Sequence, residues 1–211
     1  MKIRMVCIAV VAGLLMGISP VLAADDRPGA ADLREILAEL HSLRANFEQT
    51  VLDSEFVVDE TASGEVAIKR PGRFRWDYSE PYEQVIVSDG ETMWDYEADF
   101  EQVIVRPMDE TLATSPAMLL SGEGDLEDSF VVEDEGMQGN LRWFQLRPRV
   151  QDTEFERIRI AVGEETVELM ELRDNLGQTT RIEFHNIEFN PELPDDLFHF
   201  DPPEGVDVIR Q

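Results

Sequence analysis

The sequence has almost no cysteine, since Cys7 is the only one among its 211 residues. It lies in an N-terminal segment that we expect to be removed. The remaining chain would then contain no disulfide, no zinc–thiolate site and no thiol nucleophile. A lipid-modified protein needs a cysteine immediately after its cleavage site, and Cys7 lies far upstream of that point. We therefore do not expect the chain itself to be lipidated.

The N-terminal segment, residues 1–23, has the layout of a secretory signal peptide. A positive start is followed by an apolar run of about 14 residues, and Val21-Leu22-Ala23 offers small residues for cleavage. The run is too short for a membrane span, which needs about 20 apolar residues. We expect cleavage after Ala23, export, and a single domain over residues 24–211.

Basic residues are scarce, because 18 Lys and Arg stand against 45 Asp and Glu, for a formal net charge of −27. The predicted signal peptide contains two of the basic residues and no acidic one, so its removal changes −27 to −29. A phosphate backbone needs a basic surface, so we expect no nucleic-acid partner. A solvated, salt-tolerant surface accounts for the carboxylates. The residue spacing of an EF-hand calcium site is missing.

Catalytic motifs are missing as well. The three histidines, His41, His185 and His199, belong to no HExxH pattern, and neither a serine-nucleophile elbow nor a P-loop occurs. Carboxylates are so abundant that a paired-carboxylate hydrolase on a β-barrel is an alternative of a different class, although chance placement explains such pairs equally well. We predict no catalytic residue, no metal site and no cofactor.

The apolar pattern predicts two helical segments. The first is an amphipathic N-terminal helix, indicated by six apolar residues at helical spacing: Leu33, Ile36, Leu37, Leu40, Leu43 and Phe47. The second is short and very apolar. Thr114-Ser115-Pro116 is typical of a helix start, and Gly122 ends the segment.

Elsewhere the apolar period is two, which predicts roughly ten short strands. The clearest strand has an aromatic face, because Phe74, Trp76 and Tyr78 alternate with charged residues. A series of short strands implies a barrel or a strongly curved sheet, with the two helices available to cover its open side. The aromatic face could belong to a packed core or to a hydrophobic cavity. The pattern alone favours a packed core.

A basic cluster precedes the aromatic strand and consists of Lys69, Arg70, Arg73 and Arg75. Two interpretations are open. The cluster balances nearby carboxylates, or one arginine makes specific hydrogen bonds, since a guanidinium presents five donors.

The segment Lys69–Tyr78, together with the Ser88-Asp89-Gly90 turn and Trp94-Asp95-Tyr96, resembles the LolA family of periplasmic outer-membrane lipoprotein carriers. The resemblance extends over essentially the whole predicted mature chain. Its further motifs are Phe47-Glu48-Gln49, Gly64, Pro116–Leu120, Asp174–Gln178 and Phe198–Val208.

The resemblance implies an unclosed antiparallel β-barrel covered by short helices, with a hydrophobic cavity between them for the acyl chains of lipoproteins. It also implies a monomer in the periplasm that accepts cargo from the inner-membrane complex LolCDE and delivers it to the outer-membrane receptor LolB. Two relatives of similar fold fit less well. The receptor needs a lipidated cysteine, and a lipoprotein-sensing regulator needs a second domain.

The resemblance also assigns roles to residues. Arg70 matches the arginine that hydrogen-bonds the lid backbone and holds the empty cavity shut. The acyl-chain cavity is expected to be lined by Phe74, Trp76, Tyr78, Trp94, Met118, Leu119 and Leu120.

Overall fold

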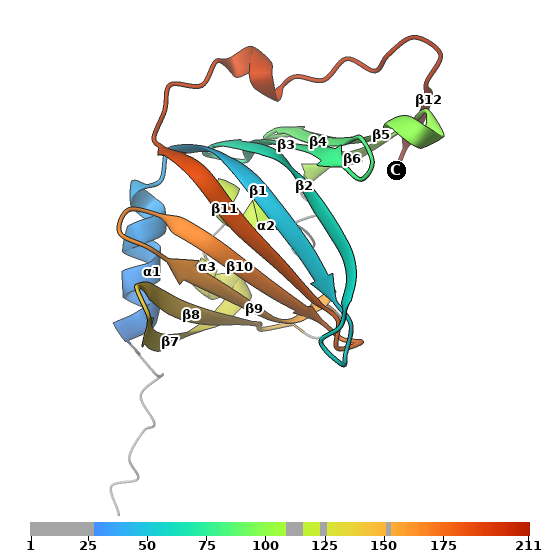
Figure 1. Cartoon of the computed structure of the whole chain (residues 1–211). Helices are drawn as coiled ribbons and strands as arrows, with labels where there is room; N and C mark the ends of the chain where they lie inside the picture. The colour runs from blue at the N-terminus through green and yellow to red at the C-terminus, as the bar shows by residue number, and fades with distance from the viewer. Residues whose placement is uncertain (1–27, 109–115, 123–125, 151–152) are drawn as a thin grey trace, which may run out of the picture.

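The computed structural model describes residues 28–108, 116–122, 126–150 and 153–211 (Figure 1). The predicted signal peptide lies outside the described residues, as do Thr114 and Ser115 of the predicted helix start. The described residues form a mainly β fold with twelve strands, where the sequence predicted roughly ten.

Twelve strands make a single unclosed sheet in the order β12-β6-β5-β4-β3-β2-β1-β11-β10-β9-β8-β7. Neighbouring strands are antiparallel except β12 and β6, which are parallel. The strands are β1 Ser42–Leu52, β2 Val58–Lys69, β3 Arg73–Glu80, β4 Gln84–Asp89, β5 Thr92–Glu97, β6 Gln102–Pro107, β7 Phe130–Gln138, β8 Leu141–Pro148, β9 Phe155–Val162, β10 Val167–Asp174, β11 Thr179–Phe189 and β12 Asp207–Arg210.

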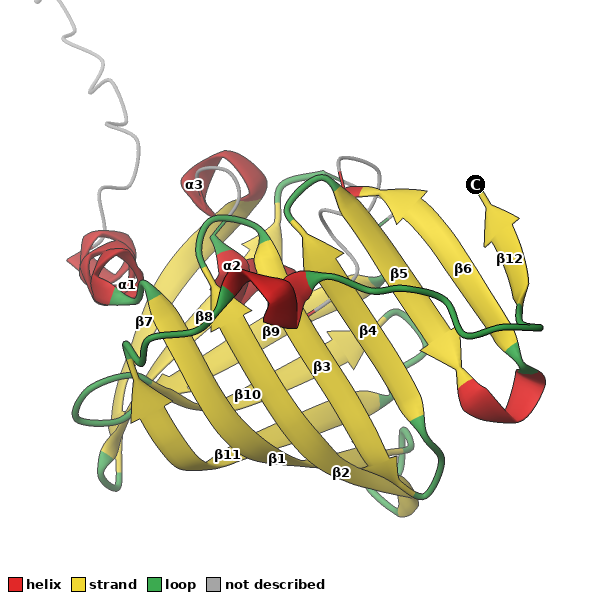
Figure 2. Ribbon diagram, turned by 90° about the horizontal axis from the view of Figure 1, so that it is seen from above, coloured by secondary structure: helices red, strands yellow, loops and turns green. Residues whose placement is uncertain are grey.

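Three short α-helices lie on the concave side of the sheet: α1 Pro28–Glu39, α2 Pro116–Ser121 and α3 Leu126–Ser129. Figures 1 and 2 show the sheet curling around α2 and α3, with α1 beside the β7 edge. The predicted architecture, an unclosed β-sheet covered by short helices, is confirmed. Within the described ranges, no helix has both the length and the apolar character to cross a bilayer.

The predicted N-terminal helix was too long, because Leu43 and Phe47 belong to strand β1. Leu40, Leu43 and Phe47 fit the spacing of a helix, but Leu43, Ala45 and Phe47 fit the period of a strand equally well. All three of the latter are buried, and β1 pairs with both β2 and β11. Because β1 forms backbone hydrogen bonds with a strand on each side, residues 42–52 adopt a strand and not a helix.

The convex side of the sheet is partly covered by the chain that follows β11. This C-terminal segment, residues 190–206, runs across β3, β4 and β5 to reach β12 (Figure 2). It contains the 3₁₀-helix η3, Asp195–Phe198, and buries Leu193 and Phe198 against Ala67 of β2.

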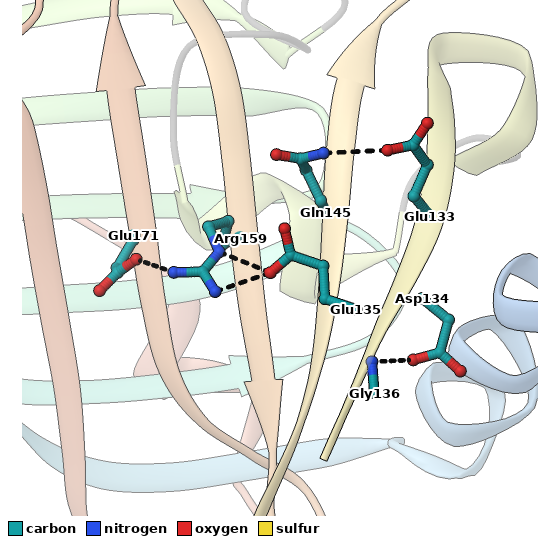
Figure 3. Close-up of polar contacts among 7 residues, drawn as sticks. All are labelled: Glu133, Asp134, Glu135, Gly136, Gln145, Arg159 and Glu171. Atoms are coloured by element: carbon teal, nitrogen blue, oxygen red, sulfur yellow. Dashed lines mark hydrogen bonds and ion pairs between the residues drawn. The ribbon is translucent and has the colours of Figure 1, made fainter. Parts of the chain in front are cut away.

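The other half of the convex side, over β7 to β10, contains a small apolar cluster of Trp143, Ala161 and Leu169 and a network of polar contacts (Figure 3). Arg159 of β9 bonds Glu135 of β7 and Glu171 of β10, at 2.6 and 2.7 Å, and its guanidinium lies 4.2 Å from the centre of the Trp143 ring. Each of these partly exposed ion pairs contributes little to the free energy of unfolding. Gly136 marks a bulge in β7, where its backbone N–H donates to Asp134 at 2.7 Å.

Candidate functional site

The aromatic face of β3 lies on the concave side of the sheet, inside the main apolar cluster. Phe74 is fully buried and Trp76 is 3% exposed, while Tyr78 is partly buried. The Phe47 ring on β1 lies 5.0 Å from both Trp76 and Tyr78, and Phe184 on β11 lies 6.1 Å from Trp76. The structure therefore brings the three predicted aromatic residues together with two more from neighbouring strands.

Tyr78 keeps this aromatic face uncharged. Its hydroxyl donates to Oε1 of Gln49 at 3.1 Å. Burial, with the nearby carboxylates of Asp95 and Glu60, raises the pKa of Tyr78 to about 12. The phenol is therefore neutral throughout the physiological pH range.

The three helices complete the apolar interior, and we call α1, α2 and α3 the lid helices. Leu33, Leu37 and Leu40 of the α1 region and Leu120 of α2 are buried in the same cluster as the aromatic face. Leu119 of α2 and Leu126 of α3 pack against it. Met118 lies within α2, and its side chain is outside the described part of the chain. The predicted residues of α2 and β3 therefore approach one another across a shared apolar interior.

Arg70 connects two of the lid helices to the sheet. It follows the last residue of β2, and its Nη1 donates to the backbone carbonyl of Leu37 in α1. The guanidinium also lies against Gly122, just after α2. A Cβ at Gly122 would stand about 2 Å from Nε and Nη2 of Arg70, so a larger residue here would displace the arginine side chain. Gly122 also has a φ of +75°, which glycine adopts readily.

The turn that contains Arg70 makes a backbone contact with the lid as well. The N–H of Gly72 donates to the carbonyl of Ser121, the last residue of α2, at 3.1 Å. Burial among these groups lowers the pKa of the Arg70 guanidinium, although the group remains a cation. The arrangement places a charged donor between the end of α1 and the end of α2.

The other three members of the basic cluster bond carboxylates. Lys69 and Arg73 both contact Asp195 of η3, at 2.5 and 2.8 Å, and Arg75 contacts Asp77 at 2.7 Å. Both interpretations of the basic cluster, charge balance and specific hydrogen bonding, therefore apply, each to different residues. Three side chains balance charge on or near the convex side, whereas Arg70 bonds a backbone carbonyl of a lid helix.

Trp94 is not part of the concave lining, and its expected role is corrected. Cross-strand register places it in a row with Ala67, Arg75 and Val87 on the convex side. Its ring lies 6.3 Å from that of His199 in the C-terminal segment. The strand alternation in β5 therefore runs opposite to the expectation.

The neighbour of Trp94, Met93, occupies the concave position, where it is 5% exposed. Sequence reasoning missed Met93 and Phe184 as lining residues, and it missed the role of Phe47 by assigning it to the first helix. The signal that could have identified Phe47 is its alternation with Leu43 and Ala45.

Histidines and carboxylates are the side chains of the described residues from which a metal-binding arrangement could be built. Across the described ranges, no group of three or more His, Cys, Asp or Glu side chains comes together as a metal site. Two of the three histidines lie near single carboxylates: His185 is 4.0 Å from Glu48 on β1, and His199 is 3.3 Å from Asp201 in the C-terminal segment.

Comparison with known proteins gives a consistent result. Residues 38–201 match the family model described as outer membrane lipoprotein carrier protein LolA. The chain is 44% identical over 184 residues to the outer-membrane lipoprotein carrier protein of Nitrosospira multiformis, covering 87% of this chain and 89% of that protein. It is 38% identical over 197 residues to that of Bordetella avium, covering 93% of each.

Solved structures show the same fold at low sequence identity. A LolA superfamily protein from Nitrosomonas europaea superposes with a TM-score of 0.51 at 13% identity, over 82% of this chain and 99% of the other. MucB superposes with a TM-score of 0.51 at 14% identity, over 87% of this chain and 66% of the other.

Proposed function

The chain belongs to the LolA family of outer-membrane lipoprotein carriers, and from this premise we propose that it carries lipoproteins through the periplasm. The family is one of carriers and not of enzymes, as the names of its members state. The observation that carries the proposal is the shared apolar interior. Lid helices and the aromatic concave face bury their side chains in one cluster, where acyl chains would replace contacts between lid and sheet.

The energetics of acyl chains explain why a carrier is needed. Burying one methylene is favourable by about 0.8 kcal/mol, so an acyl chain leaves a membrane for water very rarely. A protein that offers an apolar lining removes that barrier. Phe74, Trp76, Tyr78, Leu119 and Leu120 are the lining residues that we propose, together with Met118 of α2. Adaptable side chains of this kind suit chains of varying length.

A carrier must also release its cargo, and Arg70 is the residue that we propose for this step. In the closed state its guanidinium donates to Leu37 and lies against Gly122. Cargo that separates α1 from α2 breaks these contacts. Because the closed state has contacts of its own, its re-formation favours release. Arg70 thus acts as a latch that prevents cargo from being held too tightly.

The route of the cargo follows from the family. We propose that the protein accepts lipoproteins from the inner-membrane complex LolCDE and delivers them to the outer-membrane receptor LolB. Residues 1–23 would act as the export signal and be removed. The mature chain, residues 24–211, would work as a soluble monomer without a cofactor.

A solubilisation and transfer assay tests the proposal. A purified triacylated lipoprotein is diluted from detergent into buffer with or without the protein, and soluble lipoprotein is measured. The proposal predicts a soluble one-to-one complex, from which purified LolB takes the lipoprotein. Equal precipitation with and without the protein would contradict it.

A further inference from the structure

The Trp76 indole N–H is a buried hydrogen-bond donor that has no partner in the part of the chain that the structure describes. Its Nε1 atom is inaccessible to solvent, and no acceptor within the described residues lies in hydrogen-bond reach. The whole residue is only 3% exposed. Buried Trp N–H groups usually have a partner, because leaving one unpaired costs free energy. An unpaired donor at this place therefore calls for a functional explanation.

The side chains that flank Trp76 on the two neighbouring strands offer its N–H no acceptor. The cross-strand row through Trp76 contains Val66 on β2 and Ile86 on β4, which are apolar, and then Asp95 on β5. Asp95 lies two strands away and already accepts from Gln84 Nε2 at 2.8 Å. The contrast with Tyr78, the next residue on the same face, is direct, because the Tyr78 hydroxyl has Gln49 as its partner.

We infer that the Trp76 N–H binds the ester or amide carbonyl at the head of an acyl chain, an inference that rests on the proposed carrier function. The lining around Trp76 consists of the Phe47 and Phe184 rings and aliphatic side chains. An uncharged acceptor attached to an apolar chain suits such a place. A free carboxylate does not, because a buried anion needs a charged partner. Lipoproteins carry their acyl chains through ester and amide bonds, and thus present the required group.

The inference gives the carrier two opposing hydrogen bonds. Arg70 is bonded in the closed state and loses its partners when the lid opens, whereas Trp76 is unpaired in the closed state and gains a partner from cargo. The first favours release and the second favours loading. A ligand shifts a conformational equilibrium only through such differences between the two states. Recognition of the carbonyl would also fix how deeply the chains enter.

Matched probes separate the hydrogen bond from hydrophobic binding. The first probe is a synthetic dipalmitoyl lipopeptide, and the second is its dihexadecyl ether analogue, which keeps the chains but lacks the ester carbonyls. Wild type is expected to bind the ester probe about three- to tenfold more tightly, the range of a single neutral hydrogen bond. Trp76→Phe keeps an aromatic ring and removes the donor, so this preference should disappear. Any cavity left by the smaller ring affects both probes alike.

Trp94→Phe is the matched control, because it removes an indole N–H on the convex side. It should retain the ester preference of wild type. A Trp76→Phe variant that also retains the preference would overturn the inference. If wild type bound neither probe, the carrier function itself would fail, so the two failures are distinguishable.

The same comparison with a diacyl and a dialkyl phosphatidylethanolamine identifies the source of the ester. A preference for the ester form in both lipid classes supports the carbonyl as the recognised group. A preference seen with the phospholipid alone would overturn the assignment to lipoproteins.

NMR spectroscopy of wild type tests the contact without relying on a variant that folds. The protein has three tryptophans, so three indole N–H signals are expected. The Trp76 signal should shift when the ester probe is added and shift much less with the ether probe. Equal shifts with the two probes would overturn the inference.

Discussion

Arg70 gives the sharpest test at the scale of a single residue. Arg70→Leu removes a hydrogen bond to a charged donor, which contributes about 1.5–3 kcal/mol to the closed state. The equilibrium between the closed, empty state and the cargo-bound state should shift about 10- to 150-fold toward the cargo-bound state. We therefore expect loading to be kept and transfer to LolB to be lost, measured as two separate steps in a transfer assay.

The matched control for this experiment is Arg73→Leu. It removes the same charge three residues away, but Arg73 bonds Asp195 on the convex side and not a lid helix. Normal hand-over by a folded Arg70→Leu protein, or equal loss in both variants, would show that Arg70 serves only charge balance.

Phe74 tests the lining. Phe74→Glu places a carboxylate in a fully buried position of the concave face, so uptake of lipoprotein should be lost. An uncompensated buried charge also costs about 3–5 kcal/mol of unfolding free energy, so circular dichroism must first show a folded protein. Phe74→Leu keeps the lining apolar and should retain uptake. A folded Phe74→Glu variant that accepts cargo normally would place the acyl chains elsewhere.

At the scale of elements, α2 is the helix expected to move. Hydrogen exchange at the backbone amides of residues 118–120 should be faster in the loaded protein, because cargo separates α2 from Arg70 and from the N–H of Gly72. Amides of Met170 and Ile182, in strands β10 and β11, provide the internal control. Identical protection of α2 in empty and loaded protein would argue against a moving lid.

The ion pair between β7 and β8 should make the stability of the fold depend on pH. Arg142 of β8 bonds Asp134 of β7 at 2.6 Å and also bonds Asp32 of α1. The hydrogen bond from Arg142 lowers the pKa of Asp134 below its ordinary value of 3.8. The unfolded chain therefore binds the proton more readily, so the contribution of Asp134 is full at neutral pH and is lost as pH falls through and below 3.8.

Urea unfolding of Asp134→Asn at several pH values measures this effect. Both side chains of the pair are partly exposed, so the variant should be less stable than wild type by at most about 1 kcal/mol at pH 7. The difference should shrink toward pH 3.5 and below. Asp99→Asn, on the exposed 3₁₀ turn η1 (Ala98–Phe100), should match wild type at every pH. A constant difference for Asp134→Asn would exclude the ion pair as its cause.

The strands were the part of the fold that the sequence predicts best. The alternation of Phe74, Trp76 and Tyr78 with charged residues shows which face of β3 is buried, because burying the opposite face would bury charged side chains. Trp94 was placed on the wrong side because Met93 and Trp94 are both apolar. Alternation in β5 therefore allows either of them to face the concave side. Only pairing with β4, and cover from the C-terminal segment, decides between them. Such cover comes from residues about a hundred positions away, which local pattern does not reveal.

The lid shows a similar division. Pro116 and Gly122 mark the ends of α2 through local backbone preferences, so the helix was predictable. The contact between Arg70 and Leu37 joins residues 33 positions apart. The family resemblance supplied an arginine that bonds the lid backbone, but not that α1 provides the acceptor.

At the scale of the whole molecule, curvature and charge divide the surface into two environments. The concave side collects the aromatic rings and the lid helices in one apolar cluster, whereas the ion pairs of Arg159 with Glu135 and Glu171 lie on the convex side of a chain with net charge −27. A high net charge keeps a protein soluble and monomeric, which suits a carrier whose interior is apolar. The unclosed sheet allows the lid to separate from the concave face without breaking any strand pairing.

Native mass spectrometry of the protein purified from periplasm tests the central claim most directly. The account predicts a population of one-to-one complexes, heavier than the mature chain by the mass of an acylated lipoprotein. Phe74→Glu, purified in the same way, should lack that population. Wild-type protein recovered only in the empty form, from cells that are actively exporting lipoproteins, would contradict the claim that this protein carries acyl chains between the membranes.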